Sequence, residues 1–188
     1  MNEEKLKIIK EKALEEHIPI IMDDTLKVID TYLKEMKPKR ILEIGTAVGY
    51  SAICFSKYLA EDGIIDTIER DEERIAEAKE NIKEMKLDSK INIYEGDAVE
   101  ILPTLNNKYD AIFIDAAKGK YTFFLEQALR MLDEKGIIFA DNILYKGYVL
   151  SDYNKHKQRT AVRNLREYIK QTTENIELET QILEVGDG

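Results

Sequence analysis

The spacing of apolar residues predicts helices at the start of the chain and a different pattern after residue 40. In residues 1–36, apolar positions recur every three or four residues, which is typical of two amphipathic helices. The two stripes are Leu6, Ile9 and Ala13, and then Leu26, Ile29, Leu33 and Met36. Between them lies Ile18-Pro19-Ile20-Ile21-Met22, a helix-breaking apolar connector that we expect to pack over the core or over a ligand.

From residue 40 onwards, short apolar runs alternate with helical patterns. Strands are predicted at 40–45, 64–69, 91–95, 110–115 and 136–141, and helices at about 49–61, 72–87, 119–134 and 157–173. This alternation indicates a Rossmann-like α/β fold, with a mostly parallel, doubly wound sheet covered by helices on both faces. The last segment, 176–185, alternates polar and apolar residues and is predicted to form an antiparallel edge strand.

The stretch from Arg40 to Ser51 combines a short apolar strand, a turn bracketed by glycines and the start of a helix. Gly45 and Gly49 suit a backbone that turns tightly or approaches a ligand closely. A strand, loop and helix in this order direct backbone N–H groups at one point. We therefore expect a ligand site at this loop.

Length and composition indicate a single domain, 1–188, with a helical part at 1–36 and an α/β core at 40–188. The chain contains no apolar run of 18 residues, and its charged N-terminus does not resemble a signal peptide. One cysteine, Cys54, excludes an internal disulfide framework and a cysteine-based zinc site. We therefore expect a cytoplasmic protein without membrane contact.

The charge of the chain is unevenly distributed. The net charge of −9 argues mildly against a general nucleic-acid binder. Residues 146–170 nevertheless contain seven Lys and Arg residues and only two Asp and Glu residues. This segment is either a local basic binding surface or the solvated face of a helix.

Acidic residues stand at or near the carboxyl ends of the predicted strands. Glu43, Glu69, Asp115 and Asp141 end four of them, and Asp97 follows the strand at 91–95. Ligands of open α/β sheets bind along this edge, and a carboxylate that ends a buried strand is costly unless it has a partner there. Asp97 could instead cap the next helix, but it is improbable that all five residues are caps.

Three of these acids predict the ligand of the glycine loop. Glu43 would repel a pyrophosphate but suits an ammonium group, unless it is a cap or part of a buried pair. Glu69 is placed to accept hydrogen bonds from ribose hydroxyls, and Asp97 lies where an adenine edge would be. A nucleoside that carries an amino-acid part instead of phosphates satisfies all three, so S-adenosylmethionine is predicted.

A second set consists of Asp115 at the end of one strand and Asp141-Asn142 at the end of another. Three oxygen donors without a nearby Cys or His suit a hard cation, Mg²⁺ first, with Mn²⁺ or Ca²⁺ as alternatives and Zn²⁺ disfavoured. Lys118 begins the next helix beside this site. A bound cation would favour its neutral amine, so Lys118 is either a base or an ordinary surface lysine.

At these residues the chain resembles the cation-dependent O-methyltransferases that use S-adenosylmethionine, the group of catechol and caffeoyl-CoA O-methyltransferases with the class I methyltransferase fold. Within that family it is most similar to bacterial enzymes that methylate 5-hydroxyuridine in tRNA. The matching segments lie within residues 40–147 and read ILEIGTAVGYSA, TIERD, GDA, YDAIFIDAAKGKY and GIIFADNILYKG.

The resemblance implies a role for individual residues and a homodimer. Glu43, Gly45 and Ser51 would hold the methionine part of S-adenosylmethionine, covered by the backbone near Ile21 and Met22. Glu69 would bind the ribose, and Asp97 and Ala98 would lie at the adenine. The Mg²⁺ ligands would be Asp115, which also lies near the cofactor, Asp141 and Asn142, with Lys118 as the base.

The predicted reaction is methyl transfer from S-adenosylmethionine to the 5-hydroxyl of 5-hydroxyuridine in the wobble position of a tRNA anticodon, which gives 5-methoxyuridine. Phosphate contacts are expected from a basic stretch made of Lys155, Lys157, Arg159, Arg163 and Arg166. Two alternatives stay open. One is O-methylation of a small catechol-like phenol, and the other is a nucleotide-binding module without catalytic activity.

Overall fold

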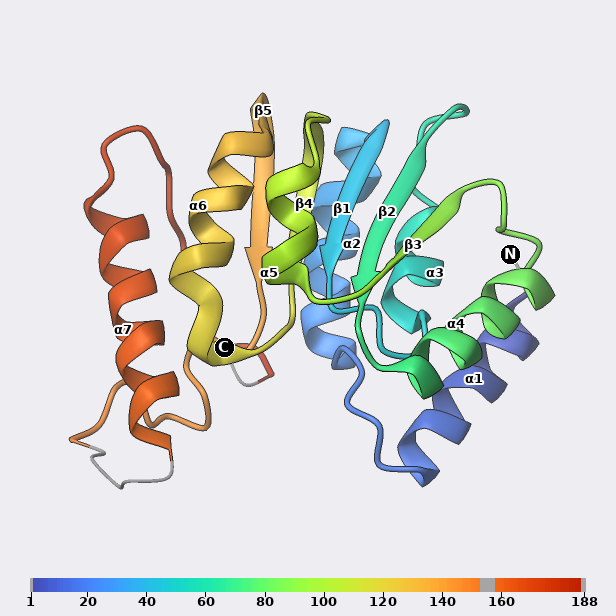
Figure 1. The fold of residues 1–188 in the computed structure, drawn as a ribbon, viewed down its shortest axis with the longest axis horizontal. Helices are drawn as coiled ribbons and strands as arrows, with labels where there is room; N and C mark the ends of the chain where they lie inside the picture. Colours follow the sequence, from blue (N-terminus) through green and yellow to red (C-terminus); the bar gives the residue numbers. More distant parts are fainter. Residues whose placement is uncertain (1, 153–157, 187–188) are drawn as a thin grey trace.

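A computed structural model describes residues 2–152 and 158–186 of the chain. Its centre is a five-stranded sheet in the order β3-β2-β1-β4-β5, and every neighbouring pair is parallel (Figure 1). The strands are β1 (Arg40–Ile44), β2 (Ile64–Glu69), β3 (Ile91–Glu95), β4 (Tyr109–Ile114) and β5 (Leu132–Ala140). The predicted α/β fold with a parallel sheet is confirmed.

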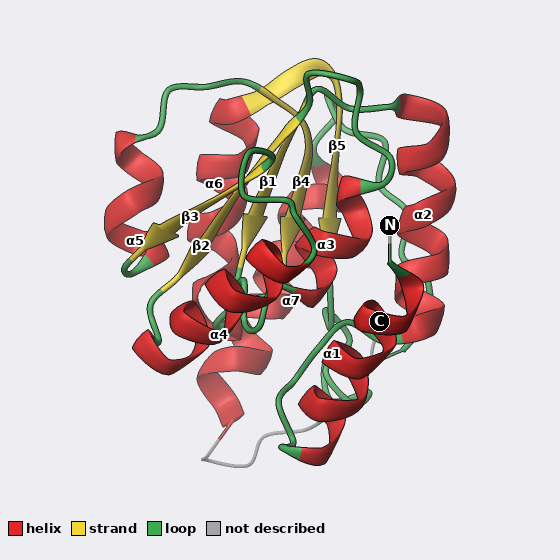
Figure 2. Cartoon of the chain, turned by 90° about the vertical axis from the view of Figure 1, so that its right-hand side faces the viewer, coloured by secondary structure: helices red, strands yellow, loops and turns green. Residues whose placement is uncertain are grey.

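Helices cover both faces of the sheet (Figure 2). One face packs on α1 (Glu3–Glu15), α2 (Asp23–Met36), α3 (Tyr50–Ser56) and α4 (Glu72–Glu84). The other face packs on α5 (Ala98–Ile101), η1 (Leu102–Thr104), α6 (Tyr121–Met131) and α7 (Arg159–Glu174), while η2 (Lys118–Lys120) leads into α6.

Alternation along β1 assigns its side chains to the two faces. Ile41 belongs to the apolar cluster with α1–α4, and Leu42 and Ile44 belong to the cluster with α6 and α7. Because successive strand residues point to opposite faces, Glu43 points towards the side of α3. The strands are apolar on both faces because helices bury both faces.

The C-terminal segment corrects one prediction. Within residues 158–186 the structure forms no strand after α7, so the predicted antiparallel edge strand at 176–185 is wrong. The backbone there makes local bonds instead. The N–H of Leu178 donates to the carbonyl of Asn175, and the hydroxyl of Thr180 donates to the carbonyl of Thr172. As a result, β5 is the outer strand on its side of the sheet.

Two further boundaries differ from the predictions. The strand β5 begins at Leu132, in a segment predicted as helix, and the β4–β5 register shifts between Tyr109 and Ala111. Gly136 permits this irregularity, because a Cβ there would lie 2.7 Å from the Leu132 side chain and 3.1 Å from the Asp110 carbonyl oxygen. The short helix α5 was not predicted, since four residues carry too little periodicity.

Among the described residues, no helix has both the length and the apolar character that crossing a membrane requires.

Candidate functional site

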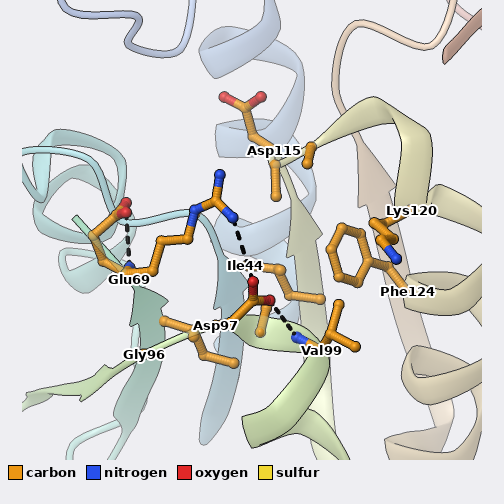
Figure 3. Close-up of a pocket in the computed structure, with 14 residues that line it drawn as sticks. Ile44, Glu69, Gly96, Asp97, Val99, Asp115, Lys120 and Phe124 are labelled. Carbon is orange, nitrogen blue, oxygen red and sulfur yellow. Dashed lines mark hydrogen bonds and ion pairs between the residues drawn. The ribbon is translucent and has the colours of Figure 1, made fainter.

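Two adjoining cavities lie at the carboxyl ends of the parallel strands. The β3-side cavity is bordered by the loops after β2 and β3 and by α6 (Figure 3), and the β5-side cavity by the 19–22 connector and the loops after β1, β4 and β5. Six residues line both: Gly45, Glu69, Arg70, Asp115, Ala116 and Ala117. Because they share this wall, the two cavities can accommodate one elongated ligand.

The glycine loop packs directly against the end of β4. Gly45 has a φ of +108°, and a Cβ at this position would lie 2.1 Å from the carbonyl oxygen of Asp115. Only glycine fits there. Gly49, with a φ of +81°, directly precedes α3. The loop therefore joins the ends of β1 and β4 into one wall of the site.

Glu43 is completely buried beneath this loop. Its carboxylate accepts hydrogen bonds from the hydroxyls of Ser51 and Thr67, each at 2.5 Å. Burial raises the pKa of Glu43 to about 7, although both hydroxyls oppose this shift. Ser51 lines the β5-side cavity whereas Glu43 does not, so one hydrogen bond separates the carboxylate from the cavity.

Glu69 occupies the junction between the two cavities. Its Oε2 accepts a hydrogen bond from the N–H of Ala47 at 2.9 Å. Its Oε1 accepts from the N–H groups of Arg70 at 2.8 Å and Asp71 at 3.0 Å. The side chain is thus fixed by backbone donors from two loops, in the wall where the ribose was predicted.

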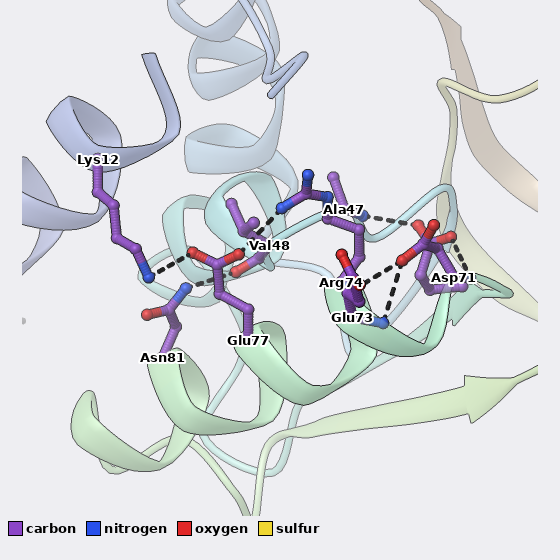
Figure 4. Close-up of polar contacts among 9 residues, drawn as sticks. Lys12, Ala47, Val48, Asp71, Glu73, Arg74, Glu77 and Asn81 are labelled. Carbon is purple, nitrogen blue, oxygen red and sulfur yellow. Dashed lines mark hydrogen bonds and ion pairs between the residues drawn. The ribbon is translucent and has the colours of Figure 1, made fainter. Parts of the chain in front are cut away.

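A polar network on the outer side holds the glycine loop in place (Figure 4). Lys12 of α1 pairs with Glu77 of α4 at 2.9 Å, and Arg74 contacts the other oxygen of Glu77 at 3.2 Å. One turn further along α4, the amide of Asn81 donates to the carbonyl of Val48 at 2.9 Å. Through α4, the N-terminal helix therefore supports the loop at the site.

Asp97 is a helix cap and also part of the cavity wall. Its Oδ1 accepts a hydrogen bond from the N–H of Val99 at 2.9 Å, which caps α5. Its Oδ2 lies 3.3 Å from the guanidinium of Arg70. Asp97 and Ala98 both line the β3-side cavity, as predicted for the adenine, and the capping alternative is confirmed as well.

The predicted metal ligands meet at the β5-side cavity. Asp115, Asp141 and Asn142 all line it, because β4 and β5 are neighbours in the sheet. Asp141 is only 3% exposed, and its Oδ1 accepts from the backbone N–H of Asn142 at 2.8 Å. Burial raises the pKa of Asp115, and the nearby Lys118 ammonium opposes this shift.

The chemistry of this donor set fits a hard cation. Two carboxylates and one amide offer only oxygen as ligands on this side of the cavity. A φ of +55° at Asn142 turns the backbone sharply right after Asp141. No group of three or more His, Cys, Asp or Glu side chains in residues 2–152 and 158–186 could hold a metal ion. The predicted set contains two such side chains, Asp115 and Asp141, together with the amide of Asn142.

Lys118 lies beside the same carboxylates. Its Nζ is 3.7 Å from Oδ1 of Asp115 and 5.7 Å from the centre of the Tyr121 ring. Tyr121 is buried, and its hydroxyl donates to the carbonyl of Asp141 at 2.8 Å. Only 19% of the Lys118 side chain is exposed, and the residue lines the β5-side cavity. Its role as a base stays a prediction.

The connector between α1 and α2 closes the β5-side cavity, as its apolar composition indicated. Pro19, Ile20, Ile21 and Met22 line it, with Ile21 buried and Met22 half-exposed. The sequence interpretation missed several other lining residues, including Arg70, which follows Glu69 directly. Others are Thr46, Tyr50, Lys120 and Phe124.

The predicted basic stretch is described only in part. Lys155 and Lys157 lie outside the described residues, and Arg159 and Arg163 are exposed on α7. Arg166 donates to the carbonyls of Tyr148 at 3.3 Å, Val149 at 3.0 Å and Ser151. Arg166 thus fastens α7 to the loop after β5, and because it is also exposed, its role as a phosphate contact stays a prediction.

Comparisons with known proteins agree with this geometry. The family model for O-methyltransferases matches residues 17–188. The chain is 35% identical to a catechol O-methyltransferase of Niastella koreensis over 78% of its own length and 67% of that protein. It is 30% identical to the caffeoyl-CoA O-methyltransferase of Populus kitakamiensis over 88% of its length and 74% of the relative.

Solved structures give the same result. A Staphylococcus aureus structure, provisionally designated a caffeoyl-CoA O-methyltransferase, is similar with a TM-score of 0.89 and 33% identity over 97% of this chain and 88% of that one. The O-methyltransferase TomG of Streptomyces achromogenes, solved in complex with SAM, has a TM-score of 0.82 and 25% identity, covering 92% and 78% of the two chains.

Proposed function

The chain belongs to the O-methyltransferase family, and we propose that it moves the methyl group of S-adenosylmethionine to the 5-hydroxyl of 5-hydroxyuridine in the wobble position of tRNA. The dependence on S-adenosylmethionine and the O-methyltransferase activity follow from the family. The tRNA acceptor, the Mg²⁺ and the homodimer are proposals for this chain.

The groove formed by the two cavities supports the binding of the methyl donor. Ser51 and the buried Glu43 behind it would receive the amino-acid part, with the connector at Ile21 as a cover. Glu69 would accept hydrogen bonds from the ribose, and the loop at Ala98 would border the base. These residues bind and orient the donor, while the buried surroundings exclude water from the reacting end.

Asp115, Asp141 and Asn142 would hold Mg²⁺ in the β5-side cavity. When bound there, the ion would lower the pKa of an acceptor hydroxyl and fix its position. Asp115 lies 3.7 Å from the Nζ of Lys118 and would orient it, and Lys118 in its neutral form would take the hydroxyl proton. A 5-hydroxyuracil offers two neighbouring oxygens to such a site, as a catechol does.

One observation carries the choice of a tRNA acceptor: this acidic protein has a basic segment, 146–170, with seven Lys and Arg residues against two Asp and Glu residues. Lys118 and Lys120 line the cavities, and the exposed Arg159 and Arg163 belong to α7. Asn164 of α7 bonds to Thr122 just after η2, at 3.0 and 3.2 Å. The amino end of α7 lies at the same end of the molecule as the carboxyl ends of the strands (Figure 1).

A catechol-like phenol is the second candidate, because the named relatives are catechol and caffeoyl-CoA O-methyltransferases. The same side chains would serve either acceptor, so the site residues do not discriminate between them. A nucleotide-binding module without catalysis has no support from these relatives.

The deciding experiment offers both acceptors to the protein. Labelled S-adenosylmethionine and Mg²⁺ are supplied with either 5-hydroxyuridine-containing tRNA or catechol, and products are identified by mass spectrometry. We expect 5-methoxyuridine, with loss of turnover on EDTA treatment and in Asp141→Ala. If only catechol were methylated, the phenol would replace tRNA as the proposed acceptor. If the wild-type protein or Asp141→Ala kept full activity in buffer with a chelator, the proposed role of Mg²⁺ would be wrong.

A further inference from the structure

Arg70 occupies an unusual place between the two cavities. It lines both of them, and 70% of its side chain is exposed. Its guanidinium reaches Oδ2 of Asp97 at 3.3 Å. The pair connects the loop after β2 with the loop after β3, so it crosses the mouth of the β3-side cavity.

Asp97 is a rigid anchor for this contact. Its Oδ1 is engaged by the N–H of Val99, which leaves Oδ2 directed at Arg70. The backbone of Arg70 is fixed too, because its N–H donates to Glu69 at 2.8 Å. Both ends of the pair are thus held by backbone hydrogen bonds, although the pair itself is exposed and contributes little to stability.

The β3-side cavity also has an apolar lining. It includes Ile44, Ile68, Val99 and Phe124. A flat heterocycle that entered this space would contact these apolar side chains and the planar guanidinium of Arg70. Guanidinium planes stack favourably on aromatic rings, which an ammonium group cannot do in the same way.

We propose that Arg70 is a specificity-determining residue that stacks over the exposed face of the adenine, and that Asp97 is a positioning residue that keeps the guanidinium in place. Through this contact the site would bind a ligand that has an adenosyl group more tightly than a ligand whose ribose carries no base. The inference rests on the binding of S-adenosylmethionine within the proposed function, and it holds for either acceptor.

The test compares two ligands that differ only in the base, S-adenosylhomocysteine and S-ribosylhomocysteine, by calorimetry. Arg70→Ala should weaken binding of S-adenosylhomocysteine by about 10-fold, in the range of base stacking, and change S-ribosylhomocysteine by less than about 2-fold. Arg70→Lys should recover less than half of the lost affinity, since it restores charge without a plane.

Asp97→Asn tests the positioning role, because it removes the charge that holds the guanidinium while asparagine caps a helix as well as aspartate does. We expect a loss of about 2- to 5-fold for S-adenosylhomocysteine alone. Lys79→Ala is the matched control. It removes another exposed ion pair, Lys79–Glu95 at 2.6 Å, which lies outside both cavities, and it should leave both affinities unchanged.

Two outcomes would overturn the inference. If Arg70→Ala weakened the binding of both ligands equally, the effect would be structural. If Arg70→Lys bound S-adenosylhomocysteine as tightly as the wild-type protein does, the effect would be due to charge alone. If Arg70→Ala bound S-adenosylhomocysteine with unchanged affinity, the inference would also be wrong, but the proposed function would stay intact. If the wild-type protein bound neither ligand, the proposed function itself would fail.

Discussion

At the residue scale, the buried Glu43 carries the most unusual electrostatics of the site. A carboxylate with no exposed surface is normally neutralised by a charged partner, but here two hydroxyls are its hydrogen-bond partners. Burial raises its pKa to about 7, against the opposing effect of the two hydroxyls. An ammonium group of a bound ligand would favour the charged form, which supports the proposed position of the amino-acid part of the methyl donor.

The raised pKa predicts a pH-dependent stability. The folded protein holds the Glu43 proton up to about pH 7, whereas the unfolded chain releases it near 4.5, so this residue costs stability as the pH rises between these values. Relative to Glu43→Gln, the wild-type free energy of unfolding should fall by about 1–3 kcal/mol from pH 4.5 to pH 8. Urea unfolding of both proteins measures this. A constant difference across that range would contradict the assignment.

Lys118 gives a second prediction at this scale. Lys118→Met should lower kcat by about 10²–10⁴-fold because the acceptor hydroxyl loses its base, while binding of S-adenosylhomocysteine stays within about 2-fold. Lys135→Met, an exposed lysine in β5, is the control and should retain full turnover. If Lys118→Met kept its kcat, the proton would have another acceptor.

At the element scale, the site depends on connections that bring distant segments to one sheet edge. The helix α4 transmits support from α1 to the glycine loop, and Gly45 allows that loop to touch the end of β4. The loop after β5 bends through positive φ values at Asn142, Tyr145 and Lys146. Such a backbone is costly and needs external support, which Arg166 provides.

Arg166→Ala should therefore loosen the loop after β5. The variant removes three carbonyl contacts, at Tyr148, Val149 and Ser151, and should lower the free energy of unfolding by about 1–3 kcal/mol. Hydrogen exchange should speed up in this loop first. Arg163→Ala, an exposed arginine of the same helix, should change the stability by less than about 0.5 kcal/mol. Equal effects of the two variants would argue against the support role.

At the scale of the whole molecule, charge distribution matters more than net charge. The protein carries −9 overall, yet residues 146–170 contain seven Lys and Arg residues against two Asp and Glu residues. A local basic surface can attract a phosphate backbone while the remaining surface repels non-specific nucleic acid. This arrangement suits one acceptor base presented by a tRNA loop.

The salt dependence of tRNA binding tests this distribution. If Arg159 and Arg163 each neutralise a phosphate, replacing both by alanine should reduce the slope of log K against log salt by about 1.5–2. Lys34→Ala with Lys83→Ala, two exposed lysines of α2 and α4, should leave the slope unchanged. A flat slope in the wild-type protein would exclude tRNA as a partner held by these residues.

Hydrophobic periodicity alone determined the parallel sheet, because strands buried on both faces and amphipathic helices each leave a distinct pattern. The acids at the strand ends were also visible, since parallel strands must bring Glu69, Asp115 and Asp141 to one edge. The sequence could not decide whether Asp97 caps α5 or lines the cavity, because both roles need the same position. In the structure Asp97 does both.

Only the tertiary structure decided which side chains reach the cavity and which support it. It buried Glu43 behind Ser51, placed Arg70 across the mouth of the β3-side cavity and assigned Arg166 to the loop after β5. It also left 176–185 without a strand partner, although the sequence alternates there. The hydrophobic periodicity of a segment indicates which of its side chains can be buried. The partner of a long polar side chain, or of an edge strand, depends instead on residues that are distant in the sequence.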